Sequence, residues 1–368
     1  METVSVAFCF NNPYCQLASG AISSLINHAS DDYQYDIYIV HDDISEHNQF
    51  LLSGLNRKAN VSIKFISIIF EDLTTEDISY TRHTKYTFAR LFFHKIFPEI
   101  DKLLYLDSDL IVNSDISELY RQNLEKFPIG GCIDNLCIEG LEELKKHKIL
   151  PHRTEFVKYG TVYEYFLSYL RLCDNEMLTY FNAGVILLNL KQYGKAIDEK
   201  LHDMLKVRYY MPDQDILNII FKDNKKILEP RFNVFDTRTI KFVNENSKYP
   251  VIIHYNGRIK PNDAMNRPAA YRYWEEVAKT SYYYPALERF VNIKIASQPD
   301  KINDPHVIEN LFFNLKRYGK THRRRKFIRL IIKMLVDGKK YKKLKRNPER
   351  FFADSKNTFI RLLGKFYN

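Results

Sequence analysis

The chain has 368 residues, of which 45% are hydrophobic and 27% charged, a composition that excludes a disordered or low-complexity protein. Its length fits one large α/β domain with an extension, or two domains. The net charge of +10 is uneven, because residues 316–368 carry 19 Lys and Arg against 3 Asp and Glu while the rest is mildly acidic, and this asymmetry indicates an interaction tail rather than a basic enzyme.

Targeting and redox signals are few. No run of about 18 apolar residues occurs, so we expect no membrane-spanning helix. The first six residues lack a basic region and enter a strand directly, so we expect no signal peptide. The five cysteines have no paired spacing and are expected to be reduced, which is typical of a cytoplasmic protein.

Strands and helices alternate over the first seventy residues. Apolar runs predict strands at 5–10, 35–40 and 61–69, and amphipathic stretches predict helices between them. This alternation is typical of a parallel sheet with helices on both faces. Ligands bind at the carboxyl ends of such strands, so we expect the loops at 11–14 and 41–43 to line one edge of the sheet.

The next apolar strand ends in two carboxylates, Asp107 and Asp109. Residues two apart in an extended strand point the same way, so both carboxylates can meet at one point while Ser108 faces away. Hard oxygen ligands of this kind suit Mn²⁺ or Mg²⁺. The alternative is a polar strand end that enters a turn, because Asp and Ser are common turn residues.

A mostly apolar helix is predicted over 86–97, before Pro98, and it contains Arg90. Two interpretations of Arg90 remain open. It could extend along the helix flank to solvent, or it could point at a phosphate or an acidic group in a cleft.

Polar residues also mark the later strands. A strand at 128–133 ends at Asp134, and a strand at 180–190 opens with Asn182, Ala183 and a glycine, small residues that allow close approach of a ligand. The charged, aromatic segment between these strands is predicted to be helical. It could be a lid or acceptor-binding insertion, or it could be purely structural.

A helix over 211–221 begins with Asp213, Gln214 and Asp215. Capping of the helix N-terminus explains the two acids but not Gln214. A strand that ends at His254 is followed by Gly257 and Lys260, which offer a backbone amide and a cation to a phosphate. No Gly-x-Gly-x-x-Gly or P-loop motif occurs, so an ATPase or a dinucleotide-dependent oxidoreductase is not expected.

The C-terminal region alternates basic clusters at 322–326 and 339–346 with apolar residues at helical spacing. We interpret it as an element that binds a membrane surface. The alternatives are a helix packed on its own domain or affinity for nucleic acid, but no nucleic-acid-binding motif is present and no such partner is expected.

Five of these stretches, in this order, resemble the retaining glycosyltransferases of family 8, which include bacterial lipopolysaccharide galactosyl- and glucosyltransferases and glycogenin. The resemblance covers about residues 3–275. It rests on the first strand with the loop at 11–14, and on 86–91, 104–109, 181–185 with 213–218, and 254–261.

The resemblance implies a GT-A fold, which is an α/β nucleotide-sugar-binding domain with a mixed, mainly parallel central sheet. We accordingly expect a catalytic domain over 1–300, with a helical insertion at 139–175. Residues 301–368 would form a basic, aromatic, helical region that attaches to a membrane surface.

The resemblance also implies roles for single residues. Asp107, Asp109 and His254 would bind Mn²⁺ (or Mg²⁺), which bridges to the diphosphate of a UDP-sugar. The other donor-binding residues would be Asn11 and Tyr14 at the uracil, Gly257 and Lys260 at the β-phosphate, and Arg90, Ser108, Asn182 and Ala183. Gln214, Asp213 and Asp134 would form the catalytic group, and Asp215 remains an alternative contact of the sugar hydroxyls.

The implied activity is transfer of galactose or glucose from the UDP-sugar to a saccharide or glycolipid acceptor, such as lipopolysaccharide, at the inner face of the cell membrane. Retention would follow from attack on the face that the leaving group occupies, with Gln214 beneath the anomeric carbon. The competing hypotheses are a metal-dependent nucleotide-sugar hydrolase and a non-catalytic module that binds membrane or nucleic acid.

Two positions depart from the family pattern. Many relatives have Asp where Asn11 or Asn12 stands, and an amide can pair with uracil but also offers a donor. Asn262 replaces the Trp that usually follows Lys-Pro.

Overall fold

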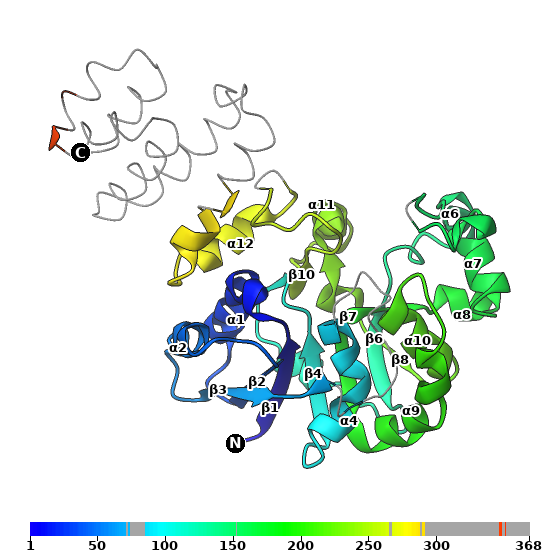
Figure 1. Ribbon diagram of the computed structural model, residues 1–368, viewed down its shortest axis with the longest axis horizontal. Helices are drawn as coiled ribbons and strands as arrows, with labels where there is room; N and C mark the ends of the chain where they lie inside the picture. Colours follow the sequence, from blue (N-terminus) through cyan, green and yellow to red (C-terminus); the bar gives the residue numbers. More distant parts are fainter. Residues whose placement is uncertain are drawn as a thin grey trace. The chain divides into compact units, whose positions relative to one another are not determined.

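The computed structural model describes residues 1–70, 73, 85–151, 153–264, 267–287, 289–290, 346–347 and 350 (Figure 1). It divides into one unit of Met1–Lys260 and Arg267–Thr280 and another of Pro261–Asn266 and Ser281–Asn368. All the predicted site residues belong to the first unit. The predicted membrane-binding helices of the C-terminal region lie outside the described residues.

A mixed sheet forms the centre of the first unit, and its described strands lie in the order β3-β2-β1-β4-β7-β6-β8. Strands β1, β2, β3 and β4 are mutually parallel where they pair, whereas β7 runs antiparallel to β4 and β6. Their bounds are β1 Thr3–Cys9, β2 Gln34–His41, β3 Val61–Ser67, β4 Lys102–Leu106, β6 Ile129–Ile133, β7 Phe181–Asn189 and β8 Lys226–Ile227. The predicted α/β fold with a mixed, mainly parallel sheet is confirmed.

A second, three-stranded sheet follows the order β5-β10-β9, with β5 Leu110–Val112, β9 Val234–Phe235 and β10 Ile252–His254. Strand β5 comes three residues after β4, so the carboxylates at 107 and 109 lie at the junction of the two sheets. Strand β10 pairs antiparallel with β5 and parallel with β9. This pairing brings a segment more than 140 residues later in the sequence to the same junction.

Three longer helices pack beside the strands: α1 Cys15–His28, α9 Leu190–Leu205 and α10 Pro212–Ile220. Helix α1 contacts β5, and α9 and α10 contact β7 (Figure 1). Helix α1 packs closely on α12 (Ala270–Val277), because a Cβ at Gly20 would lie 2.9 Å from the Tyr273 ring. The shorter α-helices are α2 Glu46–Ser53, α3 Lys85–Phe88, α4 Phe93–Ile96, α5 Ser117–Tyr120, α6 Leu141–Lys146, α7 Val162–Ser168, α8 Asp174–Leu178, α11 Thr239–Asn246 and α12 Ala270–Val277.

The helix predicted over 86–97 is not continuous. It consists of α3, a 3-10 segment at Ala89–Phe92 and α4. Arg90 lies in the 3-10 segment with its side chain directed inward, where Nε donates to the Thr87 carbonyl at 3.0 Å. The backbone changes geometry where this cation enters the protein, and hydrophobic periodicity alone does not reveal such a change.

The segment predicted as a helical insertion contains α6, α7 and α8, with a 3-10 segment at Val157–Tyr159 between α6 and α7. Its aromatic residues contribute to the core: Tyr165 and Phe166 are fully buried, and Phe166 stacks on Tyr180 with ring centroids 4.5 Å apart. These side chains stabilise the start of β7 and the end of α7 against each other.

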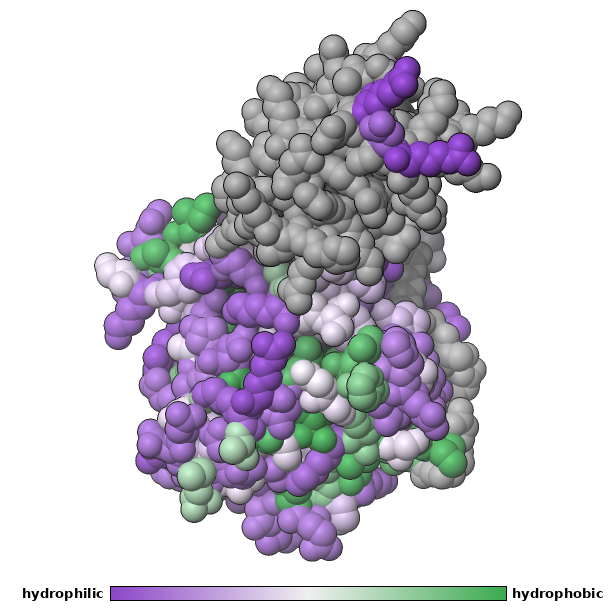
Figure 2. Space-filling model, turned by 90° about the vertical axis from the view of Figure 1, so that its left-hand side faces the viewer, coloured by the Kyte–Doolittle hydropathy of each residue, from purple (hydrophilic) through white to green (hydrophobic). Residues whose placement is uncertain are grey.

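The surface of the first unit carries hydrophobic residues among hydrophilic ones, and Figure 2 shows one such face. The large exposed hydrophobic residues include Phe50, Ile69 and Ile240, which belong to three separate elements or loops. Single exposed apolar residues are common on folded proteins, so these define no binding surface. Within the part of the chain that the structure describes, no helix has the length and apolar character needed to cross a membrane.

Candidate active site

The carboxylates of Asp107 and Asp109 and the imidazole of His254 meet where the two sheets join. Each offers one ligand atom, and these atoms all lie within 4.8 Å of one another. His254 Nε2 is 3.4 Å from Asp109 Oδ1 and 3.7 Å from Asp107 Oδ2. Backbone pairing produces this arrangement, because β10 pairs His254 with Leu110 and the Tyr255 amide donates to the Asp109 carbonyl at 2.9 Å.

This group of side chains fits a divalent cation. Two carboxylate oxygens and one imidazole nitrogen are ligands that Mn²⁺ accepts, and the carboxylates also suit Mg²⁺. The backbone leaves room beside them only because residue 184 is glycine: a Cβ at Gly184 would lie 2.3 Å from His254 Cε1 and 2.7 Å from Asp107 Oδ2. The chemistry and the shape of the site therefore both agree with the predicted metal ligands.

Lys260 forms an ion pair with Asp109 at the edge of this group. Burial by itself would raise the pKa of Asp109, but the charge of Lys260 beside it outweighs burial and holds the pKa well below its usual range. Burial would lower the pKa of Lys260, and Asp109 reverses that effect and raises it. Both side chains are therefore charged at neutral pH, so the site contains a cation beside its carboxylates.

Arg90 is 4% exposed, so it does not extend along the helix flank to solvent. Its guanidinium donates to Asp107 Oδ1 at 2.9 Å and to the Ala183 carbonyl, and it lies 3.3 Å from Asp213 Oδ2. The guanidinium also stacks over the Tyr105 ring, 4.2 Å from its centroid. Arg90 thus connects one predicted metal ligand to the start of α10, and its contacts in this structure are with the protein itself.

The predicted catalytic residues form one buried hydrogen-bond network. Gln214 Oε1 accepts from the Ala183 amide at 3.0 Å and from Asn182 Nδ2 at 2.9 Å. Asp134 Oδ2 accepts from Asn182 Nδ2 at 3.0 Å and from Gln214 Nε2 at 3.2 Å. Burial raises the pKa of Asp134 despite these hydrogen bonds. Three elements (β6, β7 and α10) thus bring these polar groups together.

The two acids that begin α10 have different environments. Asp213 faces Arg90, whereas Asp215 is fully buried on the other side of the helix. The Asp215 carboxyl accepts from the Tyr180 hydroxyl at 2.5 Å, the Tyr165 hydroxyl at 2.9 Å and the Met211 amide at 2.8 Å. Burial raises the pKa of Asp215 to about 7. Asp215 therefore stabilises the core around α10 and does not reach the metal-ligand group.

The loop after β1 contains an acceptor that the protein does not satisfy. Asn11 Oδ1 is buried and has no hydrogen-bond partner among the described residues, while Tyr14 is 40% exposed. Asn12 is used structurally, since its Oδ1 accepts from the Ser45 amide at 3.0 Å and from Asn48 Nδ2 at 2.7 Å. An unpaired buried acceptor beside an exposed ring fits the imide edge and the face of a pyrimidine base.

The structure brings Asp107, Asp109, His254, Lys260 and Arg90 into contact. Ser108 is buried. Gly257 has a φ of 97°, a left-handed conformation that favours glycine, and its amide donates to Asn256 Oδ1 at 2.7 Å.

Sequence reasoning missed three contributors to the site. The Tyr105 hydroxyl donates to Asp107 Oδ1 at 2.5 Å. Asn218 Oδ1 accepts from the Phe181 amide at 2.9 Å, and its Nδ2 donates to the Phe181 carbonyl at 2.8 Å, which fixes α10 against β7. Asn233 contacts His254 at 3.0 Å. Asn218 lies four residues after Gln214, a spacing that places both on one face of a helix and could have identified it. No local pattern identifies Asn233.

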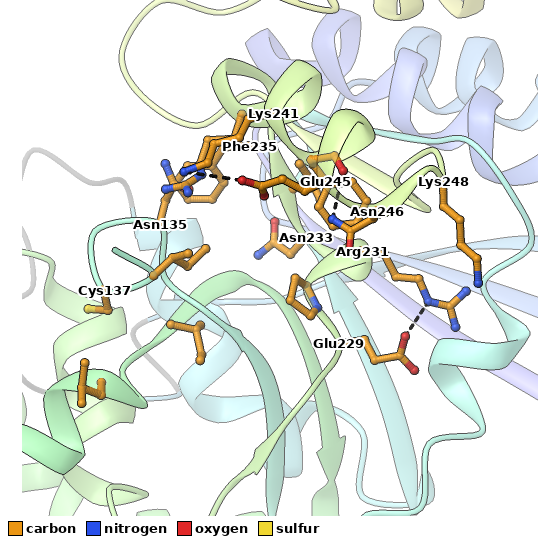
Figure 3. Close-up of a pocket in the computed structure, with 17 residues that line it drawn as sticks. Asn135, Cys137, Glu229, Arg231, Asn233, Phe235, Lys241, Glu245, Asn246 and Lys248 are labelled. Carbon is orange, nitrogen blue, oxygen red and sulfur yellow. Dashed lines mark hydrogen bonds and ion pairs between the residues drawn. The ribbon is translucent and has the colours of Figure 1, made fainter. Parts of the chain in front are cut away.

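A cavity of about 830 Å³ adjoins the site (Figure 3). Asn233 and Phe235 belong to its wall and also contact His254, because the Phe235 ring lies edge-on to the imidazole with centroids 5.4 Å apart. The cavity also has four cations (Arg231, Arg238, Lys241 and Lys248), two acids (Glu229 and Glu245), two further amides (Asn135 and Asn246) and a second ring, Phe242.

The cations of this cavity are mostly paired. Arg231 Nε donates to Glu229 at 2.8 Å, and Lys241 donates to Glu139 at 2.7 Å. Arg238 also pairs with Glu139. The cavity is therefore a polar and aromatic space in which charges are largely compensated, rather than a binding site for a strong anion.

Comparisons with known proteins identify the family of this chain. Residues 5–264 match the model of glycosyl transferase family 8. The chain is 27% identical over 277 residues to a lipopolysaccharide 1,2-glucosyltransferase of Escherichia coli, covering 71% of this chain and 73% of that protein. It is also 27% identical over 273 residues to the glycosyltransferase GlyE of Streptococcus pneumoniae, covering 70% of this chain and 56% of that protein.

Solved structures share the fold. The galactosyltransferase LgtC, solved in complex with donor and acceptor sugar analogues, superimposes with a TM-score of 0.57 at 24% identity and covers 76% of this chain and 96% of its own. The apo structure of the bifunctional glycosyltransferase WbbM gives a TM-score of 0.65 at 24% identity, covering 78% of this chain and 52% of that chain.

Proposed function

This chain belongs to glycosyl transferase family 8 and has the GT-A fold, and on that premise we propose that it transfers galactose or glucose from a UDP-sugar to a saccharide acceptor with retention of configuration. The observation that carries the proposal is the convergence of the Asp107, Asp109 and His254 ligand atoms within 4.8 Å. Lys260 lies at the edge of that group and supplies a positive charge.

Different residues would bind the diphosphate and the uracil of the nucleotide sugar. Asp107, Asp109 and His254 would hold Mn²⁺, which would neutralise charge that develops on the diphosphate leaving group. Lys260 would add a second positive charge there, because it remains protonated in this environment. Asn11 would offer its unpaired acceptor to the imide N–H of uracil, and Tyr14 would cover the face of the base.

The Gln214 network would bind the transferred sugar. Asp134 and Asn182 hold the Gln214 amide in one orientation, so a sugar bound there would meet a fixed array of donors and acceptors. A neutral amide beneath the anomeric carbon suits attack from the face of the leaving group better than covalent catalysis, which requires a carboxylate. In that reaction the leaving phosphate oxygen would accept the proton of the acceptor hydroxyl.

The cavity beside Asn233 is our candidate for the acceptor. Its amides and phenylalanine rings suit the hydroxyls and apolar faces of sugars, and it borders the metal-ligand group through Asn233 and Phe235. The name of the Escherichia coli relative supports a lipopolysaccharide acceptor. We also propose that the basic residues of 316–368 attach the enzyme to the inner face of the membrane where such an acceptor is assembled.

The test is release of UDP from a panel of UDP-sugars, with and without Mn²⁺ and without acceptor. Slow Mn²⁺-dependent turnover of UDP-galactose or UDP-glucose, accelerated by a saccharide acceptor, is the expected result. Turnover at full speed without an acceptor would identify a nucleotide-sugar hydrolase instead. If no UDP-sugar is turned over and UDP does not bind, the proposal is wrong.

A further inference from the structure

Asn233 lies immediately before β9 and is buried, with 7% of its surface exposed. Its side chain bridges two parts of the site. Oδ1 is 3.0 Å from His254 Nδ1, and Nδ2 is 2.9 Å from Asn182 Oδ1. It thus connects the metal-ligand group to the Gln214 network. Figure 3 shows Asn233 in the wall of the cavity.

The direction of every hydrogen bond in this chain of residues follows from one backbone amide. The Gly184 N–H can only donate, and it donates to Asn182 at 3.0 Å, so the accepting atom of Asn182 is its oxygen. Asn233 also approaches that oxygen and must donate to it through its NH₂ group. The Asn233 oxygen therefore faces His254, and His254 Nδ1 must carry the hydrogen that this oxygen accepts.

We propose that Asn233 is a positioning residue that holds His254 in the tautomer with hydrogen on Nδ1, which leaves the lone pair of Nε2 directed at Asp107 and Asp109. A histidine binds a cation through a nitrogen without hydrogen, and a hydrogen bond at the other nitrogen decides which one that is. The assignment rests on the proposed function only in that the ion bound there is the cofactor of the transferase.

Without Asn233 the other tautomer would gain a partner. A hydrogen on Nε2 could be donated to Asp109 Oδ1, which is 3.4 Å away, and the nitrogen would then be blocked for a metal. Packing does not prevent this change, because the Phe235 ring and Gly184 restrict rotation of the imidazole but are indifferent to where its hydrogen lies. The choice of tautomer thus depends on Asn233.

The direct test is ¹⁵N NMR of the two imidazole nitrogens of His254 in metal-free protein, at a pH where the ring is neutral and with signals assigned through His254→Gln. The wild-type protein is expected to show hydrogen on Nδ1. Asn233→Leu has a similar size and no acceptor, so it is expected to shift the ring toward hydrogen on Nε2. Asn233→Asp keeps an acceptor toward Nδ1 and is expected to retain the wild-type tautomer.

The second readout is binding of Mn²⁺ alone, followed by electron paramagnetic resonance. Loss of an outer hydrogen bond to a metal-binding histidine typically weakens metal affinity about 10- to 100-fold, which is the loss expected for Asn233→Leu. Asn233→Asp keeps the acceptor and should therefore bind Mn²⁺ more tightly than Asn233→Leu by about the same 10- to 100-fold. Thermal unfolding of each variant separates these effects from loss of the fold.

Two results would overturn the inference. One is hydrogen on Nε2 in the wild-type protein, which needs no variant to detect. The other is an Asn233→Leu protein that has the wild-type tautomer and the wild-type affinity for Mn²⁺. If the wild-type protein binds no Mn²⁺ but shows hydrogen on Nδ1, the proposed cofactor is wrong while the role of Asn233 in fixing the tautomer stands.

Discussion

Gly184 and His254 approach each other so closely that a Cβ on Gly184 would lie 2.3 Å from the imidazole Cε1. Gly184 belongs to β7 in the large sheet and His254 ends β10 in the small sheet. Their contact fixes the distance between the two sheets at the point where the proposed metal ligands meet. The absence of a side chain at residue 184 is therefore as important to the site as the ligands themselves.

We expect Gly184→Ala to abolish transferase activity and to weaken binding of Mn²⁺, because the added methyl group must displace His254 or Asp107. Metal affinity by electron paramagnetic resonance and turnover of the UDP-sugar measure the two effects. The control is Gly54→Ala, whose Cβ would meet only ordinary contacts at 3.4 Å. Retention of metal affinity in Gly184→Ala would show that the site is wider than the structure indicates.

Asp109→Asn is expected to reduce transfer to background, since it removes one charged ligand and the partner of Lys260. Breaking a buried ion pair typically costs about 3–5 kcal/mol, an upper limit here because Lys260 is partly accessible. Metal-dependent UDP release and chemical denaturation measure these changes. Asp101→Asn, at an exposed pair with Lys191, should alter neither. Normal Mn²⁺-dependent activity of Asp109→Asn would refute the assigned site.

The buried Asp215 predicts a pH dependence of stability. Burial raises its pKa to about 7 in the folded protein, well above the usual value of an aspartate, so the folded state binds the proton more tightly than the unfolded state. The free energy of unfolding should therefore fall as pH rises from about 4 to about 7, by an amount on the order of a few kcal/mol, and this contribution should level off at higher pH.

Asp215→Asn removes this titration and is expected to flatten the pH dependence over that interval. The amide can replace the protonated carboxyl, because its oxygen can accept from Tyr165 and Met211 while its NH₂ group donates to the Tyr180 hydroxyl oxygen. Urea denaturation at pH 4.5 and pH 7.5 measures the difference. If the free energy of unfolding changes equally between pH 4.5 and pH 7.5 in the variant and in the wild-type protein, Asp215 is ionised in the folded state.

If the cavity beside Asn233 binds the acceptor, Phe242→Ala should raise the KM for the acceptor about two- to tenfold, which corresponds to the loss of one aromatic contact. Hydrolysis of the UDP-sugar without acceptor should stay unchanged, because Phe242 belongs to α11, which carries none of the proposed metal ligands and no residue of the Gln214 network. Phe50→Ala, at a fully separate exposed site, is the matched control. A rise in the rate constant for hydrolysis or no change in KM would place the acceptor elsewhere.

Removal of residues 316–368 should abolish binding to vesicles that contain anionic lipid and leave UDP-sugar hydrolysis intact. Each Lys or Arg near an anionic surface contributes about 1 kcal/mol, so the 19 basic residues of this segment should dominate the interaction. Vesicle flotation at low and high salt measures it, with vesicles of neutral lipid as control. Undiminished binding of the shortened chain would show that residues 1–315 make the membrane contact.

The sequence predicted correctly which candidate site residues lie at the ends of strands. Asp107 directly follows β4, and His254 ends β10. Both strands are apolar runs followed or terminated by a polar residue, and hydrophobicity alone predicts such runs. The same reasoning placed Asp134 after one strand and Asn182 at the start of another. The interpretation of 86–97 as one helix was wrong in part, because the backbone departs from α geometry at Arg90.

Periodicity also left open which acid of α10 serves the site. Residues 213 and 215 lie on opposite sides of a helix, so the sequence implied different environments but not which acid faced the core. The structure answers this through Tyr165 and Tyr180, whose hydroxyls hold Asp215 inside the protein. Neither tyrosine is near Asp215 in the sequence.

The sequence by itself determined the family, the order of the strands along the chain and the chemical types of the proposed metal ligands, because these depend on local composition and spacing. Tertiary structure alone decided the hydrogen-bond directions and the clearances at the site. Asn233 meets His254 only through the pairing of β9 with β10, and Gly184 meets it only through the approach of two sheets. Contacts between residues so distant in sequence are set by packing and have no local signal.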